Sequence, residues 1–146
     1  MAEFDTETLA SVIREGGGEG YSNVPYSNLD GGDIITFAYK ADKPGLANTN
    51  LYDAIPLIAV MSVKRSRKDG RILIAGLNTH YLDSKFDRGR VVFSMRSGLR
   101  TFGTSLKNRM IHNYLTKNMR SPIYKLSNAV MDPAILKSGA NWESVE

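Results

Sequence analysis

The sequence predicts an α+β fold: a small, strongly bent antiparallel sheet or barrel-like core with C-terminal helices and an extended N-terminal arm. Two apolar runs, residues 56–63 and 71–77, flank a polar stretch that ends in Asp69-Gly70, a pattern typical of a β-hairpin. The first 32 residues are rich in glycine and in acidic residues, as in a flexible arm. The last third combines helical apolar spacing with Ser-Pro and Asp-Pro pairs, which favour helix starts.

The length of 146 residues fits one compact domain. We expect residues 33–146 to form it, with residues 1–32 as a flexible acidic arm that carries a short helix. The absence of cysteine excludes disulfides, thiolate metal ligands and a cysteine nucleophile. No apolar run approaches the ~20 residues of a membrane span, and the acidic N-terminus does not resemble a signal peptide. We therefore expect synthesis in a cytoplasm and no membrane partner.

The first predicted element is a short helix over residues 6–15. Thr6 is a suitable N-cap, and Leu9, Val12 and Ile13 have the spacing of one apolar stripe. Three glycines then end the helix. A helix of this length is marginal alone, so it must dock on the body or fray.

Residues 16–32 have the composition of a linker, interrupted by Tyr21 and Tyr26. We expect these tyrosines to lie along a partner surface or along the body of the same chain. Residues 1–33 contain seven acidic residues and one basic residue, whereas residues 34–146 contain eighteen basic and eight acidic residues. An arm of this charge can fold back on the basic body, reach a neighbouring subunit, or serve as a solubilising leader.

Residues 34–39 are β-branched and aromatic, which predicts the first strand. Pro56 is expected to open the next strand, where a missing N–H does least harm. The nearly continuous apolar runs of the central hairpin predict that both of its faces are at least partly covered. Residues 91–95 fit either a further strand or the start of a helical region.

A longer helix is predicted over residues 104–118. Leu106, Met110 and Tyr114 form one i, i+4 row there, and we expect this stripe to pack on the sheet.

Two further short helices are predicted downstream. Ser121-Pro122 and Asp132-Pro133 each place proline at the first helical position. Trp142 follows in a tail that otherwise lacks bulky residues. It either pins the C-terminal tail to the body or inserts into a partner, and pinning is favoured.

The pattern of reactive side chains does not predict an enzyme, a cofactor or a metal site. The two histidines, His80 and His112, fall in different predicted elements, and no zinc, phosphate-loop or serine-hydrolase motif is present. His80 is interpreted either as a catalytic base or as a hydrogen-bonding group that shapes a turn, and the second interpretation is favoured. Tyr52-Asp53 is expected to form an Asx-type turn, with Tyr52 packed against the sheet.

Basic residues are the main positive feature of the surface. They cluster at the predicted hairpin turn, residues 64–71, and between Asp87 and Asp132, where nine basic residues occur without an acid. Such clusters suit either a phosphate backbone or a protein interface, and composition does not choose between them. The candidate partner-binding residues are Tyr21, Tyr26, Lys64, Arg65, Arg67, Lys68, Arg96, Arg100, Lys107 and Trp142.

Two segments carry a family resemblance. They are Tyr52-Asp53-x-x-Pro56-Leu57 and Gly76-Leu77-Asn78-x-His80-Tyr81-Leu82. They resemble the YD-x-x-PL and GLN-x-HYL segments of a family of small proteins encoded by contractile-tailed, T4-superfamily-like bacteriophages. The resemblance covers roughly residues 34–82, with a looser match near the C-terminus. It departs from the family at Ala54-Ile55, where an aromatic residue is expected, and at Thr79, which replaces an aliphatic residue.

The resemblance implies a structural subunit of a tailed phage virion, made in the host cytoplasm. The tail or baseplate is the first choice of position and the neck the second. The implied partners are other virion proteins, and a homo-oligomer also fits. The alternative is a phage nucleic-acid-binding protein that contacts DNA through the basic regions 64–71 and 88–125.

Overall fold

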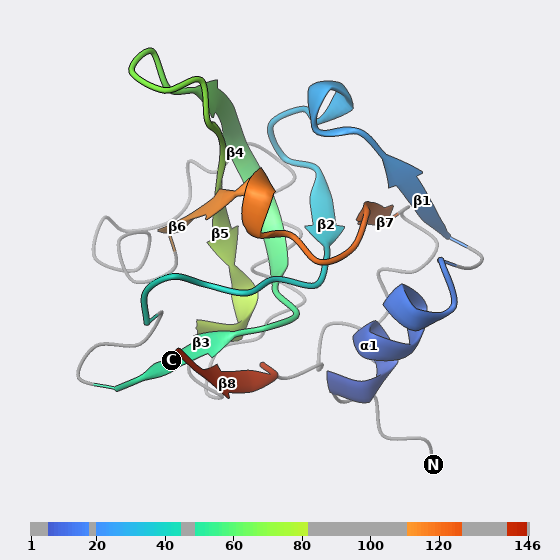
Figure 1. Ribbon diagram of the computed structural model, residues 1–146. Helices are drawn as coiled ribbons and strands as arrows, with labels where there is room; N and C mark the ends of the chain where they lie inside the picture. Colours follow the sequence, from blue (N-terminus) through green and yellow to red (C-terminus); the bar gives the residue numbers. More distant parts are fainter. Residues whose placement is uncertain (1–5, 18–19, 45–48, 82–110, 127–139, 146) are drawn as a thin grey trace.

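Antiparallel strands dominate the computed structural model, which describes residues 6–17, 20–44, 49–81, 111–126 and 140–145 (Figure 1). The described helix and strands are α1 (Thr6–Arg14), β1 (Tyr21–Val24), β2 (Ile34–Thr36), β3 (Leu51–Asp53), β4 (Leu57–Arg65), β5 (Ile72–Asn78), β6 (Ile111–Leu115), β7 (Ile123–Leu126) and β8 (Trp142–Ser144). The described 3-10 turns are η1 (Tyr26–Asn28), η2 (Thr79–Tyr81) and η3 (Thr116–Asn118). None of the described helices is long and apolar enough to cross a membrane.

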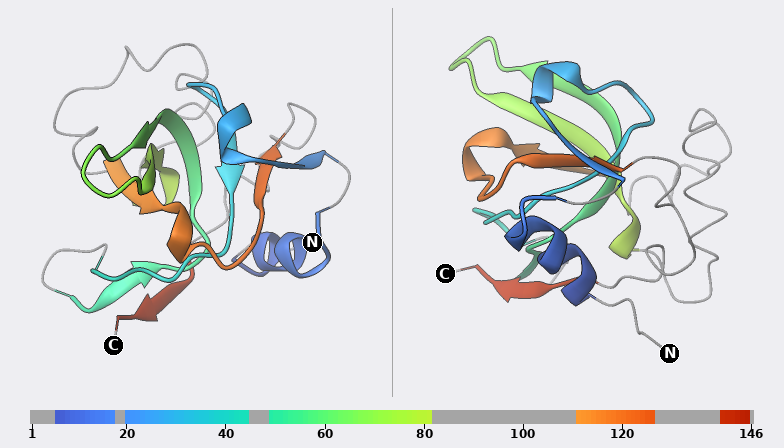
Figure 2. Two further views of the ribbon diagram at one scale, coloured as in Figure 1. Left: turned by 45° about the horizontal axis from the view of Figure 1, so that its top comes forward. Right: turned by 90° about the vertical axis from the view of Figure 1, so that its right-hand side faces the viewer.

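Six of the described strands form one sheet in the order β1-β7-β2-β4-β5-β6, and β3 pairs with β8 separately. The paired strands are antiparallel. The described fold is rich in antiparallel sheet, as predicted. The sheet is not closed into a barrel, because β1 and β6 form its two ends. Figures 1 and 2 show that the β4–β5 turn lies at the opposite end of the molecule from β3 and β8.

The predicted central hairpin is confirmed as β4 and β5. Its pairing runs from Ile58 opposite Asn78 to Arg65 opposite Ile72, with a bulge between Val60 and Ser62. The turn residue Gly70 has a φ of 71°, a conformation that glycine adopts without steric cost. The Asp-Gly pair of the sequence therefore marks the turn correctly.

The core lies on both faces of the central strands, as the apolar runs predict. Ile34, Leu57 and Leu77 belong to a buried cluster on one face. Their neighbours in the strands, Ile35 and Ile58, belong to a second buried cluster. Adjacent residues of one strand point to opposite faces, so a continuous apolar run fills two cores.

The predicted N-terminal helix is confirmed as α1, and it docks on the body. Leu9 is 1% exposed and lies in the same cluster as Ile34, Leu57 and Leu126. The helix ends where the chain turns at Gly16, whose φ is 76°. Docking supplies the stabilisation that a nine-residue helix lacks on its own.

The prediction of a linker over residues 16–32 is wrong at Tyr21–Val24. These residues form β1, which pairs with β7 from Tyr21 opposite Leu126 to Val24 opposite Ile123. The composition is that of a linker, but an open sheet edge offers the backbone N–H and C=O partners that a free segment lacks. Just after this segment, the Oδ1 of Asp33 lies 3.2 Å from the Nζ of the basic residue Lys125.

The helix predicted over residues 104–118 is wrong in its described part, and the helix predicted after Ser121-Pro122 is also wrong. Residues 111–115 form β6, which pairs with β5, and residues 123–126 form β7 between β1 and β2. Ser121 does not cap a helix; its hydroxyl accepts the backbone N–H of Ala38 at 2.9 Å. Cross-strand pairing overrides the local helical spacing of these segments. The features predicted at residues 91–95, 104–110 and 132–139 lie outside the described residues.

The C-terminal tail is pinned to the body, as predicted, but mainly through its backbone. Strand β8 pairs with β3, and the N–H of Val145 donates to the carbonyl of Asn50 at 2.7 Å. The Trp142 side chain remains 37% exposed, and its ring meets Tyr81 edge-on at 5.4 Å. The tail is therefore held as a strand rather than by a buried tryptophan.

Candidate functional site

The two segments that carry the family resemblance meet at Asp53. Asp53 ends β3, Asn78 ends β5, and η2 then turns the chain so that His80 faces back toward Asp53. The Oδ2 of Asp53 lies 2.6 Å from the Nδ1 of His80 and accepts the Nδ2–H of Asn78 at 3.0 Å. The Oδ1 of Asn78 accepts the backbone N–H of His80 at 2.9 Å, which fixes the turn.

The second carboxylate oxygen of Asp53 ties two more segments to this cluster. Its Oδ1 accepts the N–H of Ile55 and the N–H of Asn141, each at 3.2 Å. The bond to Ile55 is the predicted Asx-type turn. The bond to Asn141 fixes the chain just before β8, so one side chain connects β3, β5, η2 and the C-terminal tail.

The Asp53–His80 pair is deeply buried, with the two residues 3% and 5% exposed. Burial by itself would raise the pKa of Asp53. The hydrogen bond and the charge of His80, with the bonds from Asn78 and the Asn141 N–H, outweigh burial and lower that pKa below its ordinary value. The carboxylate is therefore ionised and accepts every hydrogen bond offered to it.

The burial of His80 favours its interpretation as a structural residue. The side chain of His80 has no exposed surface. A general base must come within hydrogen-bond reach of the proton that it removes from a substrate. In this arrangement the imidazole reaches Asp53 instead, and it stabilises the η2 turn.

Asn78 links the buried pair to a group of aromatic rings. Its Nδ2 also donates to the hydroxyl of Tyr114 on β6 at 3.1 Å. Tyr114 meets Phe37 and Tyr39 edge-on, at centroid distances of 5.4 and 5.1 Å. Burial raises the pKa of both tyrosines, so their hydroxyls remain protonated at neutral pH.

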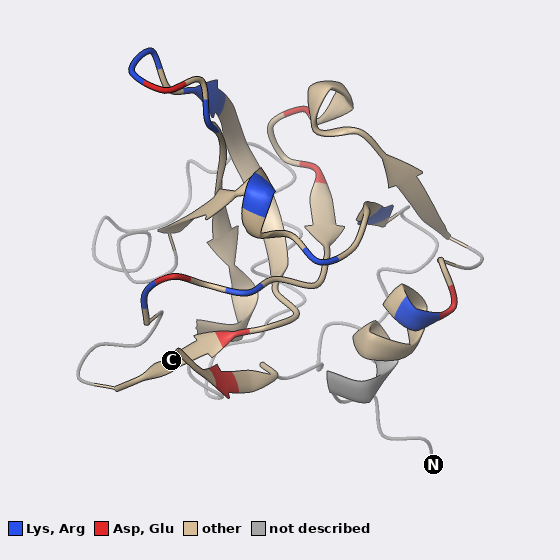
Figure 3. Ribbon diagram, viewed as in Figure 1, with Lys and Arg blue, Asp and Glu red and all other residues tan. Residues whose placement is uncertain are grey.

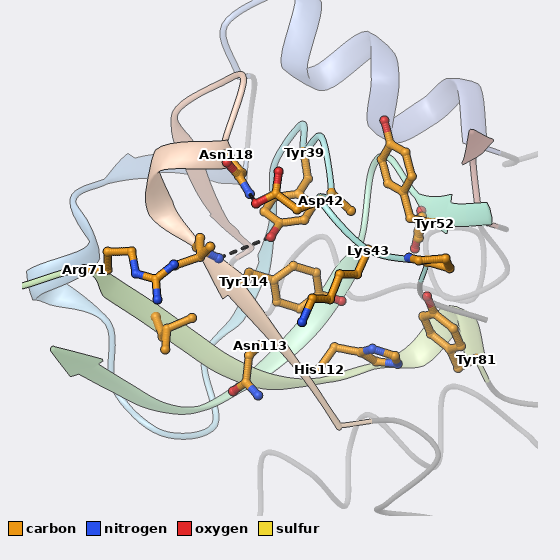
Figure 4. Close-up of a pocket in the computed structure, with 15 residues that line it drawn as sticks. Tyr39, Asp42, Lys43, Tyr52, Arg71, Tyr81, His112, Asn113, Tyr114 and Asn118 are labelled. Atoms are coloured by element: carbon orange, nitrogen blue, oxygen red, sulfur yellow. Dashed lines mark hydrogen bonds between the residues drawn. The ribbon is translucent and has the colours of Figure 1, made fainter. Parts of the chain in front are cut away.

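A pocket of about 310 Å³ opens over these rings, between β5 and β6 on one side and residues 41–44 on the other (Figure 4). Tyr39 and Tyr114 lie at its base, and the hydroxyl of Tyr39 accepts the N–H of Leu115 at 3.2 Å. Lys43 and Arg71 are exposed cations on its rim. The pocket therefore combines an aromatic base with charged residues at its opening, where the exposed carboxylate of Asp42 lies near the two cations.

One wall of the pocket is a stack of two rings. Tyr81 of η2 and His112 of β6 are 4.2 Å apart at an interplanar angle of 28°. Burial raises the pKa of Tyr81 far above its ordinary value, with a further contribution from the charge of Asp53. This wall joins η2 to β6, and Asp53 of the buried pair also contributes to the lining.

The basic residues predicted at the hairpin turn lie together on an exposed tip (Figure 3). We call residues 64–71 the basic tip. Lys64, Arg65, Arg67 and Lys68 are exposed there, and the Asp69 carboxylate lies 2.6 Å from the Nε of Arg71. The structure thus brings one predicted cluster together on one projecting turn.

The other predicted partner-binding residues do not converge with the basic tip. Tyr21 is on β1, Tyr26 is on η1, and Trp142 is on β8 (Figure 1). Arg96, Arg100 and Lys107 lie outside the described residues.

Sequence reasoning missed the pocket because it assigned His112, Asn113 and Tyr114 to a helix. The signal was the alternation within Ile-His-Asn-Tyr-Leu, where Tyr114 is buried and Asn113 exposed. Lys43 belongs to no sequence pattern that singles it out. The pairing of β5 with β6 brings His112, Asn113 and Tyr114 near Arg71 and Tyr81.

Within the described residues, no group of three or more histidine, aspartate or glutamate side chains is arranged to hold a metal ion. Comparison with protein-family models, with curated proteins and with solved structures finds no match to this chain.

Proposed function

We propose that this chain is a structural subunit of a contractile-tailed phage particle, in the tail or baseplate as the first choice and at the neck as the second. It acts through contacts with other virion proteins. One observation carries the proposal: most residues of the two segments that resemble the phage family are buried and stabilise the fold. Tyr52, Asp53, Pro56, Gly76, Asn78 and His80 are all buried.

Because these residues are buried, they support a structural role, in which the protein acts through its shape. Outside these buried residues, the described part of the chain includes the exposed basic tip and the two end strands of the open sheet. Exposed strand edges and arginine-rich surfaces are common means of protein association.

Cross-linking mass spectrometry on purified particles of a phage that encodes this chain tests the proposal. We expect cross-links from Lys64 or Lys68 to tail, baseplate or neck proteins. Absence of the chain from purified particles, with recovery on DNA from infected cells, would overturn the structural assignment.

The basic tip favours nucleic-acid binding as the second candidate function. It carries five basic residues and one acidic residue on an exposed turn. Phosphate contacts of this kind release counterions, so the affinity for duplex DNA would fall steeply with salt. A mobility-shift assay from low to high salt tests this candidate: strong, salt-sensitive binding supports it, and absence of binding at low salt excludes it.

A further inference from the structure

We propose that the pocket between β5, β6 and residues 41–44 anchors an acidic segment of a neighbouring protein, with one aromatic side chain of that segment inserted. This inference rests on the proposed function, because it names how a virion partner is held.

The size and lining of the pocket suit a single large side chain. Its volume of about 310 Å³ is at the lower end of the range for ligand sites, roughly 300–1,000 Å³. Ala41, Pro44, Leu73 and Leu115 contribute to an apolar wall beside the rings. Protein interfaces gain most of their affinity from a few aromatic anchors that fill pockets of this kind.

The packing of the rings favours an inserted side chain over a stacked nucleobase. Bases bind single-strand-binding proteins by stacking on open aromatic faces. Tyr81 is already stacked on His112 and meets the Trp142 ring edge-on, and Tyr39 meets Tyr114 at an interplanar angle of 81°. A partner ring that enters the pocket can join this edge-to-face arrangement as a further member.

The basic tip beside the pocket favours acidic residues next to the inserted ring. Lys43 and Arg71 stand at the opening, and Arg71 continues into the basic tip. The nearby carboxylates are engaged: Asp42 accepts the Nδ2–H of Asn118 at 3.0 Å, and Asp69 pairs with Arg71. Asp42 and Asp53 also line the pocket, so the charges of the lining itself balance. The surplus of positive charge comes from the other exposed bases of the basic tip, Lys64, Arg65, Arg67 and Lys68, and it attracts an acidic segment and speeds its approach.

Fluorescence anisotropy with the full chain and a labelled peptide, Gly-Asp-Glu-Tyr-Glu-Asp-Gly, tests the inference. We expect saturable binding that weakens about tenfold or more when Asn113→Trp fills the opening or Lys43→Glu reverses a rim charge. Asn23→Trp is the matched control, because Asn23 is exposed on β1 at the other end of the sheet. Lys40→Glu is the control for charge. Thermal unfolding of each variant checks that it folds.

The peptide with tyrosine replaced by alanine should bind at least about tenfold more weakly, because it lacks the anchor. Equal affinity of the wild type, Asn113→Trp and Lys43→Glu for the tyrosine peptide would overturn the inference. A second outcome would also overturn it: the peptide does not bind, but an oligo-dT probe binds the wild type and not Asn113→Trp. The pocket would then be a nucleotide site.

The proposed peptide-binding pocket and the proposed virion role can be contradicted separately. If the peptide binds with the expected pattern but the chain is absent from purified particles, the pocket stands and the virion role fails. If the peptide does not bind and particles incorporate Asn113→Trp as well as the wild type, the pocket fails and the virion role stands.

Discussion

At the scale of single residues, Asp53 is the residue that connects the segments of the buried cluster. Its carboxylate accepts hydrogen bonds from Ile55, Asn78 and Asn141 and pairs with His80. The Tyr52-Asp53 pair could be predicted as an Asx-type turn from sequence because that turn is local. Its bonds to Asn78 and His80 could not, because they depend on how β3 is placed beside the end of β5.

Replacing Asp53 with Asn should destabilise the fold by about 3–5 kcal/mol at neutral pH, because it removes one partner of a buried pair. The folded pKa of Asp53 is lowered, so its contribution to the free energy of unfolding is complete above the unfolded value of 3.8. That contribution is lost as the pH falls through the lower folded pKa. Denaturant unfolding between pH 2 and 7 should therefore show that the free energy of unfolding falls more steeply with decreasing pH in the wild type than in Asp53→Asn.

Asp69 provides the control for this prediction. Its pKa is also lowered, first by the backbone N–H of Arg71, but its side chain is exposed on the basic tip. Asp69→Asn should leave the acid loss of stability close to that of the wild type, since solvent screens exposed pairs. Equal effects of the two substitutions would contradict the assignment of the buried pair as a main source of stability.

Gly76 of β5 is required by close packing between β4 and β5. A Cβ atom on Gly76 would lie 2.8 Å from the carbonyl oxygen of Ala59. Gly76→Ala should therefore destabilise the protein by about 1–3 kcal/mol, measured by urea unfolding. Gly31→Ala is the matched control, because its nearest neighbour would be the carbonyl oxygen of Met61 at 3.6 Å, and it should be nearly neutral. A neutral Gly76→Ala would show that the strands can separate without cost.

At the scale of elements, the sequence predicts those whose signal is local. The β4–β5 hairpin follows from two apolar runs and an Asp-Gly turn, and α1 follows from its cap, its stripe and its glycines. Strands β1, β6 and β7 are defined by their partners instead. Tyr21–Val24 pairs with Leu126–Ile123, and Ile111–Leu115 pairs with β5, so tertiary pairing decides the conformation of segments with weak or helical local patterns.

The docking of α1 leads to a prediction about the arm. Leu9 is buried in the core cluster, whereas Val12 is partly exposed on the same helix. Leu9→Ala should lower the free energy of unfolding by about 2–5 kcal/mol, and Val12→Ala should have a clearly smaller effect. Equal small losses in urea unfolding would mean that the helix is not an integral part of the fold.

At the scale of the whole molecule, the buried cluster that stabilises the described fold and the exposed basic tip lie at opposite ends. The Asp53 cluster, β3 and β8 lie at one end, and the basic tip lies at the other (Figure 2). The pocket connects them, since Asp53 and Arg71 both contribute to its lining. Changes to the basic tip should therefore alter binding without altering stability.

Reversing three charges of the basic tip, Arg65, Arg67 and Lys68 to Glu, separates the two candidate functions. The thermal midpoint should stay within about 2 °C of the wild type, because exposed substitutions far from the core change stability little. If the chain is a virion subunit whose tip contacts an acidic neighbour, particles should incorporate the variant poorly, while the wild type shows no salt-sensitive binding to DNA. If the chain is a DNA-binding protein, the wild type should bind duplex DNA and the variant should lose that binding. The corresponding glutamine variant measures loss of charge without repulsion, and it should show an intermediate defect in either case, since like charges brought together add a penalty to the lost attraction.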